Sequence, residues 1–246
     1  MRKNSKKRRH PDLATNVSAV IVAGGRGERL GMNAPKAFVP LNGKPLFSYS
    51  LEVFDSHPEI TDIHVVIPEG FHEKTLGYLD GISLNKNVMV ITGGAERWIS
   101  VCNGVQSVDP GDEWVMVHDA ARPFVTRKII DDLLALRSEF KAVITATPVN
   151  DTLRTFRKNY CLKTVNRENY LRVGTPQLFS RSALLTCFES VERLSEIPTD
   201  EAAIMEQAGY RIGFAWGDTM NYKITSQSDL AVAEALLAFR DKYGKE

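Results

Sequence analysis

The chain has 246 residues, of which 43% are hydrophobic and 25% are charged, a composition typical of ordinary globular proteins. This length fits one large α/β unit, and no apolar run approaches the about 20 residues that a membrane-spanning helix needs. The basic start of the chain is not followed by an apolar segment, so we expect no secretory signal peptide and a cytoplasmic protein.

Residues 1–16 form a basic tail. Six of the 31 Lys and Arg residues lie at positions 1–9, so the rest of the chain carries 25 basic residues against 30 acidic ones. Such a run of like charge is typical of a disordered tail, and a weak contact with nucleic acid or a membrane is the alternative. The mildly acidic remainder, which we expect to form a single domain over residues 17–243, does not suit a nucleic-acid-binding surface.

The three cysteines, Cys102, Cys161 and Cys187, form no CxxC pair. No Cys/His cluster has the spacing of a zinc site either. We expect free thiols in a reducing compartment.

Short β-branched, apolar runs alternate with helical patterns along the chain. The alternation predicts an α/β fold with a Rossmann-like, doubly wound, mostly parallel sheet, in which ligands bind beyond the carboxyl ends of the strands. The predicted strands cover residues 17–24, 62–68, 87–94, 114–117 and 141–149. The predicted helices cover residues 45–57, 97–108, 126–140 (with Thr126 as N-cap) and 228–243 (capped by Ser228).

Residues 151–179 interrupt this alternation. They read as two strands around the polar turn at residues 157–159. Such a hairpin is either an addition to the edge of the sheet or an arm that reaches a second subunit. We expect a protruding β-hairpin arm over about residues 150–172.

A glycine-rich turn follows the first predicted strand. Gly24, Gly25 and Gly27 come directly after Ala23, and glycine there permits close approach of backbone N–H groups to a polyphosphate. The Walker pattern GxxxxGK[ST] is absent, and the dinucleotide pattern GxGxxG fails because Leu30 stands where it needs glycine. The glycines alone are equally compatible with a structural strand–helix turn.

Two basic residues that follow the glycines in the sequence favour a phosphate site over a structural turn. Arg29 lies two residues after Gly27, and Lys36 follows Pro35. Arg offers a planar fork for phosphate oxygens and Lys a compact charge. This pair suits a triphosphate whose α-phosphorus gains negative charge during attack.

The turn and six later motifs resemble the nucleotidyltransferases. Their order and spacing are similar to those of the 2-C-methyl-D-erythritol 4-phosphate cytidylyltransferases of the non-mevalonate isoprenoid pathway, over about residues 17–243. The motifs are AGGRGERLGMNAPKAF (23–38), GGAERWISVCNGV (93–105), VHDAARPF (117–124), TVNR (164–167), TPQLF (175–179), TDEA (199–202) and NYKIT (221–225), with Asp151 and Thr152 between them.

The resemblance implies a transfer of CMP from CTP to the 4-phosphate of methylerythritol, with Mg²⁺ as cofactor. It gives Arg29, Lys36 and Lys223 the role of stabilising the transition state, and Asp119 a place near the ribose, the substrate and the metal. The residues that it implies around the nucleotide are Ala23, Gly24, Gly25, Gly27, Gly94, Ala95, Ser100, Asp119 and Ala120.

The resemblance also implies a homodimer. Thr152 and Arg167 on the arm would hold the sugar-alcohol phosphate in the partner subunit's site. Thr175 and Thr199 are further candidates for that pocket. No membrane or nucleic-acid partner is implied.

Three positions depart from the family pattern: the Gly24-Gly25 doublet, Ala37 and Asn166. The doublet also occurs in relatives that act on pentitol or pentulose phosphates, so a ribitol- or ribulose-5-phosphate cytidylyltransferase is an alternative. The intact HDAARP motif favours the methylerythritol enzyme. A nucleotide-binding regulator without catalysis is the alternative from another class.

Two aromatic side chains inside the motifs, His118 and Trp98, could have either a functional or a structural role. The attacking phosphate is already an anion at neutral pH and needs no base, so we expect His118 to be a structural residue at a strand end. Trp98 either covers the base or packs its own helix.

Overall fold

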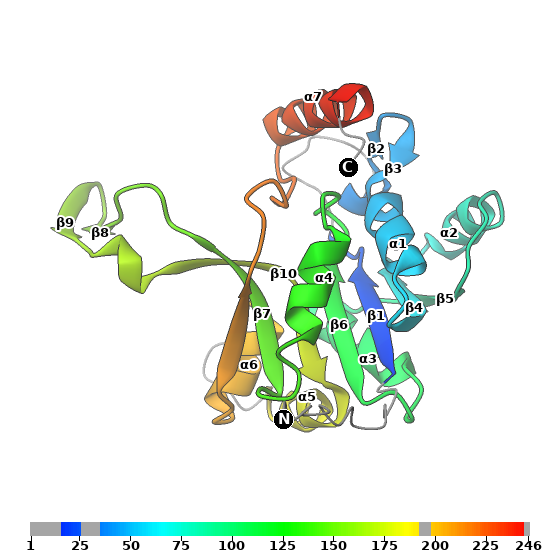
Figure 1. Ribbon diagram of the computed structural model, residues 1–246, viewed down its shortest axis with the longest axis horizontal. Helices are drawn as coiled ribbons and strands as arrows, with labels where there is room; N and C mark the ends of the chain where they lie inside the picture. The colour runs from blue at the N-terminus through cyan, green and yellow to red at the C-terminus, as the bar shows by residue number, and fades with distance from the viewer. Residues whose placement is uncertain (1–15, 26–34, 192–197, 244–246) are drawn as a thin grey trace, which may run out of the picture.

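A seven-stranded sheet forms the centre of the computed structural model (Figure 1). The structure describes residues 16–25, 35–191 and 198–243, with the side chains of residues 241–243 excepted. β10 runs antiparallel to both of its neighbours, whereas the other neighbouring strands pair in parallel. The predicted mostly parallel sheet is therefore confirmed. The strand order is β11 (Ile212–Trp216), β7 (Ala142–Pro148), β10 (Leu171–Ser180), β6 (Trp114–Asp119), β1 (Val17–Val22), β4 (Ile60–Ile67), β5 (Asn87–Thr92).

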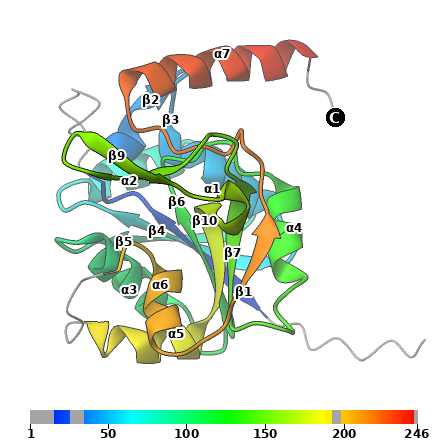
Figure 2. The same cartoon turned by 90° about the vertical axis from the view of Figure 1, so that its left-hand side faces the viewer.

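Helices cover both faces of the sheet (Figures 1 and 2). Successive residues of β1 point to opposite faces: Ala19 and Ile21 belong to one buried cluster, and Val20 belongs to the other. This alternation is what a strand needs when apolar helices lie on both sides of it. The first face is covered by α1 (Leu46–Ser56) and α4 (Arg127–Leu134), and the second by α3 (Arg97–Ser107), α5 (Arg181–Phe188) and α6 (Glu201–Gln207).

Three further elements lie at the periphery. α2 (His72–Leu79) packs near β5. α7 (Gln227–Tyr243) lies beyond the carboxyl ends of the strands, at the top of Figure 1. It packs on the small hairpin of β2 (Pro40–Leu41) and β3 (Lys44–Pro45), where Leu41, Phe124 and Ala233 share a third buried cluster. None of the helices that the structure describes is long and apolar enough to cross a membrane.

Two predicted helix boundaries are wrong. α4 ends at Leu134 rather than Phe140, although Thr126 caps it as predicted by accepting a hydrogen bond from the Ile129 N–H. α7 begins at Gln227, so Ser228 is not its cap. Ser226 Oγ accepts from the Asp229 N–H at 3.2 Å, and the Asp229 carboxylate accepts from the Ser226 N–H at 2.9 Å. This reciprocal pair is a capping box.

The arm contains one hairpin, and the strand after it belongs to the main sheet. β8 (Arg154–Arg157) and β9 (Tyr160–Thr164) pair only with each other and protrude on the left of Figure 1. The prediction of two strands over residues 151–179 is therefore wrong, because β10 is a third strand inserted between β6 and β7. Pro176 argues against a central strand, and it is tolerated here because the ladder shifts register between Gly174 and Gln177.

Candidate active site

A pocket of about 810 Å³ lies at the carboxyl ends of β1, β4, β5 and β6. Its position agrees with the ligand site expected for a doubly wound sheet. Lys36 is kept beside the glycine turn because its N–H donates to the Gly25 carbonyl at 3.1 Å. Of the predicted site residues, those that line the pocket are Ala23, Gly24, Gly25, Lys36, Gly94, Ala95, Ser100, Asp119, Ala120 and Lys223.

The other predicted residues within the described ranges do not line this pocket. Gly27 and Arg29 lie outside the described residues. Thr152 and Arg167 are exposed on the arm, and Thr199 is exposed just before α6. For these five residues the sequence-based roles remain predictions.

The loop between β5 and α3 forms one wall of the pocket. Ser100 Oγ in the first turn of α3 accepts from the Gly94 N–H at 3.0 Å and donates to the Glu96 carbonyl at 3.1 Å. A Cβ atom on Gly94 would lie 2.2 Å from Ile99 Cγ2, and one on Gly93 would lie 2.7 Å from Ser100 Oγ. Only glycine lets the backbone fold this tightly over α3, so Gly93 and Gly94 present backbone groups alone to the pocket.

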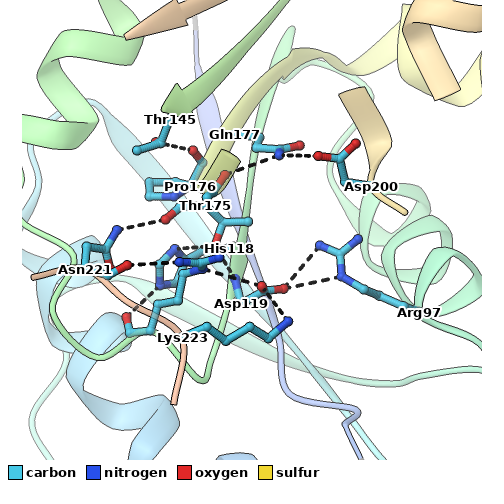
Figure 3. Close-up of polar contacts among 12 residues, drawn as sticks. Arg97, His118, Asp119, Thr145, Thr175, Pro176, Gln177, Asp200, Asn221 and Lys223 are labelled. Carbon is cyan, nitrogen blue, oxygen red and sulfur yellow. Dashed lines mark hydrogen bonds and ion pairs between the residues drawn. The ribbon is translucent and has the colours of Figure 1, made fainter. Parts of the chain in front are cut away.

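Asp119 is the electrostatic centre of the site (Figure 3). Its carboxylate lies 3.2 Å from Arg97 Nη2, 2.9 Å from Lys223 Nζ and 3.7 Å from Arg122 Nε. Burial alone would raise the pKa of Asp119, but the attraction of Arg97, then of Lys223 and Arg122, holds that pKa well below its usual range. Asp119 is therefore ionised at any working pH.

Sequence reasoning missed the contribution of two residues. Arg97 Nη1 donates to both carboxylate oxygens of Glu201, at 2.7 and 2.9 Å, while Nε and Nη2 approach Asp119 Oδ1. Both residues stand inside quoted motifs, GGAERW and TDEA, but the two partners are 104 positions apart. An Arg at the first position of a helix that follows a glycine pair was the available signal, and its partner could not be read from one sequence.

His118 is buried and hydrogen-bonded at both ring nitrogens. Thr175 Oγ1 accepts from the Asp119 N–H at 2.9 Å, so its single proton is directed to His118 Nδ1 at 3.3 Å. Nε2 then carries the ring proton and donates to the Arg122 carbonyl at 3.0 Å. Burial lowers the pKa of His118 to about 4, so the ring is neutral. This geometry supports a structural His118, and it places Thr175 beneath Asp119 rather than in the pocket.

A second pocket of about 300 Å³ adjoins the first, and Lys223 lines both. Arg122 and Arg172 add two guanidinium groups to its lining, and Thr145 and Thr147 line it as well. Asn221 is 5% exposed, and its Oδ1 has no hydrogen-bond partner within the part of the chain that the structure describes. The second pocket therefore offers two guanidinium groups and one ammonium group to a small anion.

Asp119 also suits a divalent cation that arrives with a nucleotide. The described ranges contain no cluster of three or more His, Cys, Asp or Glu residues that could hold a metal alone. Mg²⁺ is usually bound by one or two carboxylates together with substrate phosphates and water. One ionised, buried carboxylate at the pocket wall matches that donor set.

The structure shows the surroundings of two of the positions that depart from the family pattern. Ala37 is 3% exposed, where it joins the buried cluster under η2 (Lys36–Phe38) and also lines the larger pocket. Asn166 caps the short helix η3 (Arg167–Asn169), because its Oδ1 accepts from the Glu168 N–H at 3.1 Å. Arg167 Nη1 donates to the Asn150 carbonyl instead of pairing with residue 166.

Trp98 packs rather than covering the pocket. Its Nε1 donates to Glu96 Oε2 at 2.8 Å, and its ring lies against the buried cluster of α3 and α5. The packing alternative from the sequence is therefore the one that the geometry supports.

Comparisons with known proteins agree with the geometry. The family model described as "IspD: 2-C-methyl-D-erythritol 4-phosphate cytidylyltransferase" matches residues 17–239. A protein of that name from Alkaliphilus metalliredigens is 35% identical over 227 residues, which cover 92% of this chain and 94% of the relative. One from Bacillus mycoides is 35% identical over 223 residues, covering 91% and 98%.

Solved structures show the same fold. A 4-diphosphocytidyl-2C-methyl-D-erythritol synthase from Anaerococcus prevotii superposes with a TM-score of 0.81 at 26% identity, covering 92% of this chain and 99% of that one. A 2-C-methyl-D-erythritol 4-phosphate cytidylyltransferase from Thermus thermophilus has a TM-score of 0.75 at 28% identity, covering 91% and 99%. The chain belongs to the 2-C-methyl-D-erythritol 4-phosphate cytidylyltransferase family.

Proposed function

We propose that the protein transfers CMP from CTP to 2-C-methyl-D-erythritol 4-phosphate. The observation that carries this proposal is the ionised Asp119 beside Lys223, at the boundary of two pockets. The larger pocket has the backbone-lined wall that suits a nucleotide, and the smaller one has cations that suit a phosphorylated polyol. Family membership supports both assignments.

In the proposed reaction, an oxygen of the acceptor's 4-phosphate attacks the α-phosphorus of CTP. A new P–O–P bond forms, the bond between the α-phosphorus and the bridging oxygen to the β-phosphorus breaks, and pyrophosphate leaves with the electron pair. Lys36 and Lys223 offset the charge that grows on the α-phosphate, and Arg29 is predicted to join them. No general base is needed, since the nucleophile is already an anion.

We propose that Asp119 helps to hold Mg²⁺. The ion would neutralise triphosphate charge when bound. The protein's own part is to keep the Asp119 carboxylate ionised and fixed at the pocket wall.

We propose that the acceptor lies in the smaller pocket and that the arm of a second subunit completes its site through Thr152 and Arg167. The arm exposes Phe156 at 74% and Leu162 at 57%. Exposed apolar side chains of this size are typical of a surface that another protein covers, which supports a homodimer. The small phosphorylated substrates fit an enzyme of the cytoplasm.

The test is pyrophosphate release from CTP and Mg²⁺ with methylerythritol 4-phosphate, ribitol 5-phosphate and ribulose 5-phosphate in parallel. We expect turnover with the first acceptor only. Turnover with a pentose-derived acceptor instead would move the protein to the neighbouring specificity. CTP binding without release from any acceptor would favour the nucleotide-binding regulator.

A further inference from the structure

A buried carboxylate outside both pockets is connected to the reaction centre. Glu201 stands in the first turn of α6, is 1% exposed, and lines neither pocket. Burial raises the pKa of Glu201, although Arg97 opposes that shift. A carboxylate so deeply buried is costly unless its ionic partner is fixed, and that partner is Arg97.

All three nitrogens of the Arg97 guanidinium group contact one of two carboxylates. Nη1 makes the bidentate contact with Glu201, at 2.7 and 2.9 Å, while Nη2 and Nε lie 3.2 and 3.4 Å from Asp119 Oδ1. Figure 3 shows Arg97 and Lys223 reaching the Asp119 carboxylate from different sides. Since an arginine side chain has many rotamers, the bidentate anchor on Glu201 is what limits Arg97 to the one that meets Asp119.

The two oxygens of Asp119 therefore have different partners. Arg97 occupies Oδ1, whereas Lys223 and Arg122 approach Oδ2 at 2.9 and 3.7 Å. Lys223 and Arg122 line the smaller pocket, and Arg97 and Lys223 line the larger one. The contact between Arg97 and Oδ1 therefore fixes how the Asp119 carboxylate is oriented between the two pockets. Glu201 also neutralises Arg97, so that Arg97 acts as an orienting donor.

We propose that Glu201 is a positioning residue for cytidylyl transfer, acting through Arg97 to fix the orientation of the Asp119 carboxylate. This inference rests on the proposed function, since it concerns the rate of that reaction. It predicts that Glu201 has no effect of its own once Arg97 is gone. It also predicts an effect on turnover more than on nucleotide binding, because Glu201 contacts neither pocket.

The test is a double-mutant cycle on the full chain with CTP, Mg²⁺ and methylerythritol 4-phosphate. Glu201→Gln, of nearly equal shape, is expected to lower kcat about tenfold, as lost orienting partners of catalytic ligands do, with the KM for CTP within about twofold. In an Arg97→Met background, adding Glu201→Gln should cause no further loss. Glu206→Gln, an exposed position on the same helix, is the matched control and should equal wild type.

Each outcome decides one claim. Equal losses from Glu201→Gln in both backgrounds, or wild-type kcat in Glu201→Gln, would overturn the positioning role. Thermal unfolding of every variant identifies loss of fold, and Arg97→Lys, which keeps the charge without the fork, replaces Arg97→Met if that chain does not fold. A wild-type chain inactive with this acceptor would instead contradict the proposed function.

Discussion

Lys223 lines both pockets. Its Nζ lies 2.9 Å from Asp119 Oδ2, and its side chain is 39% exposed. This position lets the ammonium group face a phosphate in either pocket while Asp119 keeps it in place. The account therefore assigns Lys223 a role in the transition state and expects it to matter more for turnover than for folding.

Lys223→Met should lower kcat about a hundredfold, equivalent to about 3 kcal/mol, as the loss of one oxyanion donor does. Steady-state pyrophosphate release measures it. Lys128→Met, whose side chain is 80% exposed on α4, is the control and should keep wild-type turnover. Near-normal turnover of Lys223→Met would remove Lys223 from the mechanism.

His118 gives stability a pH dependence of known sign. Its folded-state pKa of about 4 lies below the ordinary 6.5, and burial is the main cause. Between these values the unfolded chain binds more protons than the folded one. The contribution of the neutral His118 ring to the free energy of unfolding is fully present above pH 6.5 and is lost as the pH falls towards 4, by up to roughly 3 kcal/mol.

Urea unfolding of wild type and His118→Gln at pH 7 and 4.5 measures this loss of stability. The fall should be smaller in the variant, and equal falls would contradict a buried, neutral His118.

At the scale of elements, α3 carries Arg97 and Ser100 to the pocket, and its distance from the sheet is set by one glycine. A Cβ atom on Gly104 would lie 2.5 Å from Val20 Cγ1 and 2.7 Å from Val66 Cγ2. Both neighbours are fully buried branched side chains, so they have little room to move. α3 therefore has to shift if this position gains a side chain.

Gly104→Ala should lower the free energy of unfolding by about 1–3 kcal/mol through overpacking and raise the KM for CTP. Gly77→Ala in α2 is the matched control, because nothing lies within 4 Å of its added Cβ, and alanine should stabilise that helix by about 0.8 kcal/mol. Denaturant unfolding and steady-state kinetics measure both. An unchanged stability of Gly104→Ala would contradict the close packing of α3.

The long periodic elements were predictable, whereas elements defined by tertiary pairing were not. β1 and α3 follow from hydrophobic patterns that any packed sheet requires. β10 contains Pro176, which locally argues against a strand, and only the register shift in the pairing of β10 with β7 makes the proline compatible. The start of α7 depends on a hydrogen-bond exchange between Ser226 and Asp229 that competes with the equally plausible cap at Ser228.

The candidate site shows the same division. The family resemblance indicated Lys36, Asp119 and Lys223, since each lies in a motif of recognisable spacing. The pair of Arg97 and Glu201 was missed because each partner alone looks like an ordinary charged residue at a helix start. Their pairing arises only when α3 and α6 come to lie on the same face of the sheet.

At the scale of the whole molecule, the arm is the feature that lies away from the main sheet. β8 and β9 pair with no other strand that the structure describes, and Figure 1 shows them projecting to the left, away from the sheet. The proposed homodimer gives the arm a role, because Arg167 of one chain would complete the acceptor site of the other. Each active site would then contain residues from both chains.

Mixing a Lys36→Ala chain with an Arg167→Ala chain tests this sharing. Each variant alone should be nearly inactive. After mixing and random exchange of subunits, half of the dimers are mixed and carry one intact site of two, so about a quarter of wild-type activity should return. Confirmed mixing without recovery would contradict sharing in trans.

The central claim concerns which phosphorus of CTP is attacked, and ³¹P NMR of the reaction with methylerythritol 4-phosphate tests it most directly. The account predicts that CTP and acceptor signals are replaced by pyrophosphate and by one new diphosphate with two coupled, inequivalent phosphorus nuclei. Formation of CDP with a doubly phosphorylated acceptor, or of CMP and pyrophosphate with the acceptor unconsumed, would contradict cytidylyl transfer.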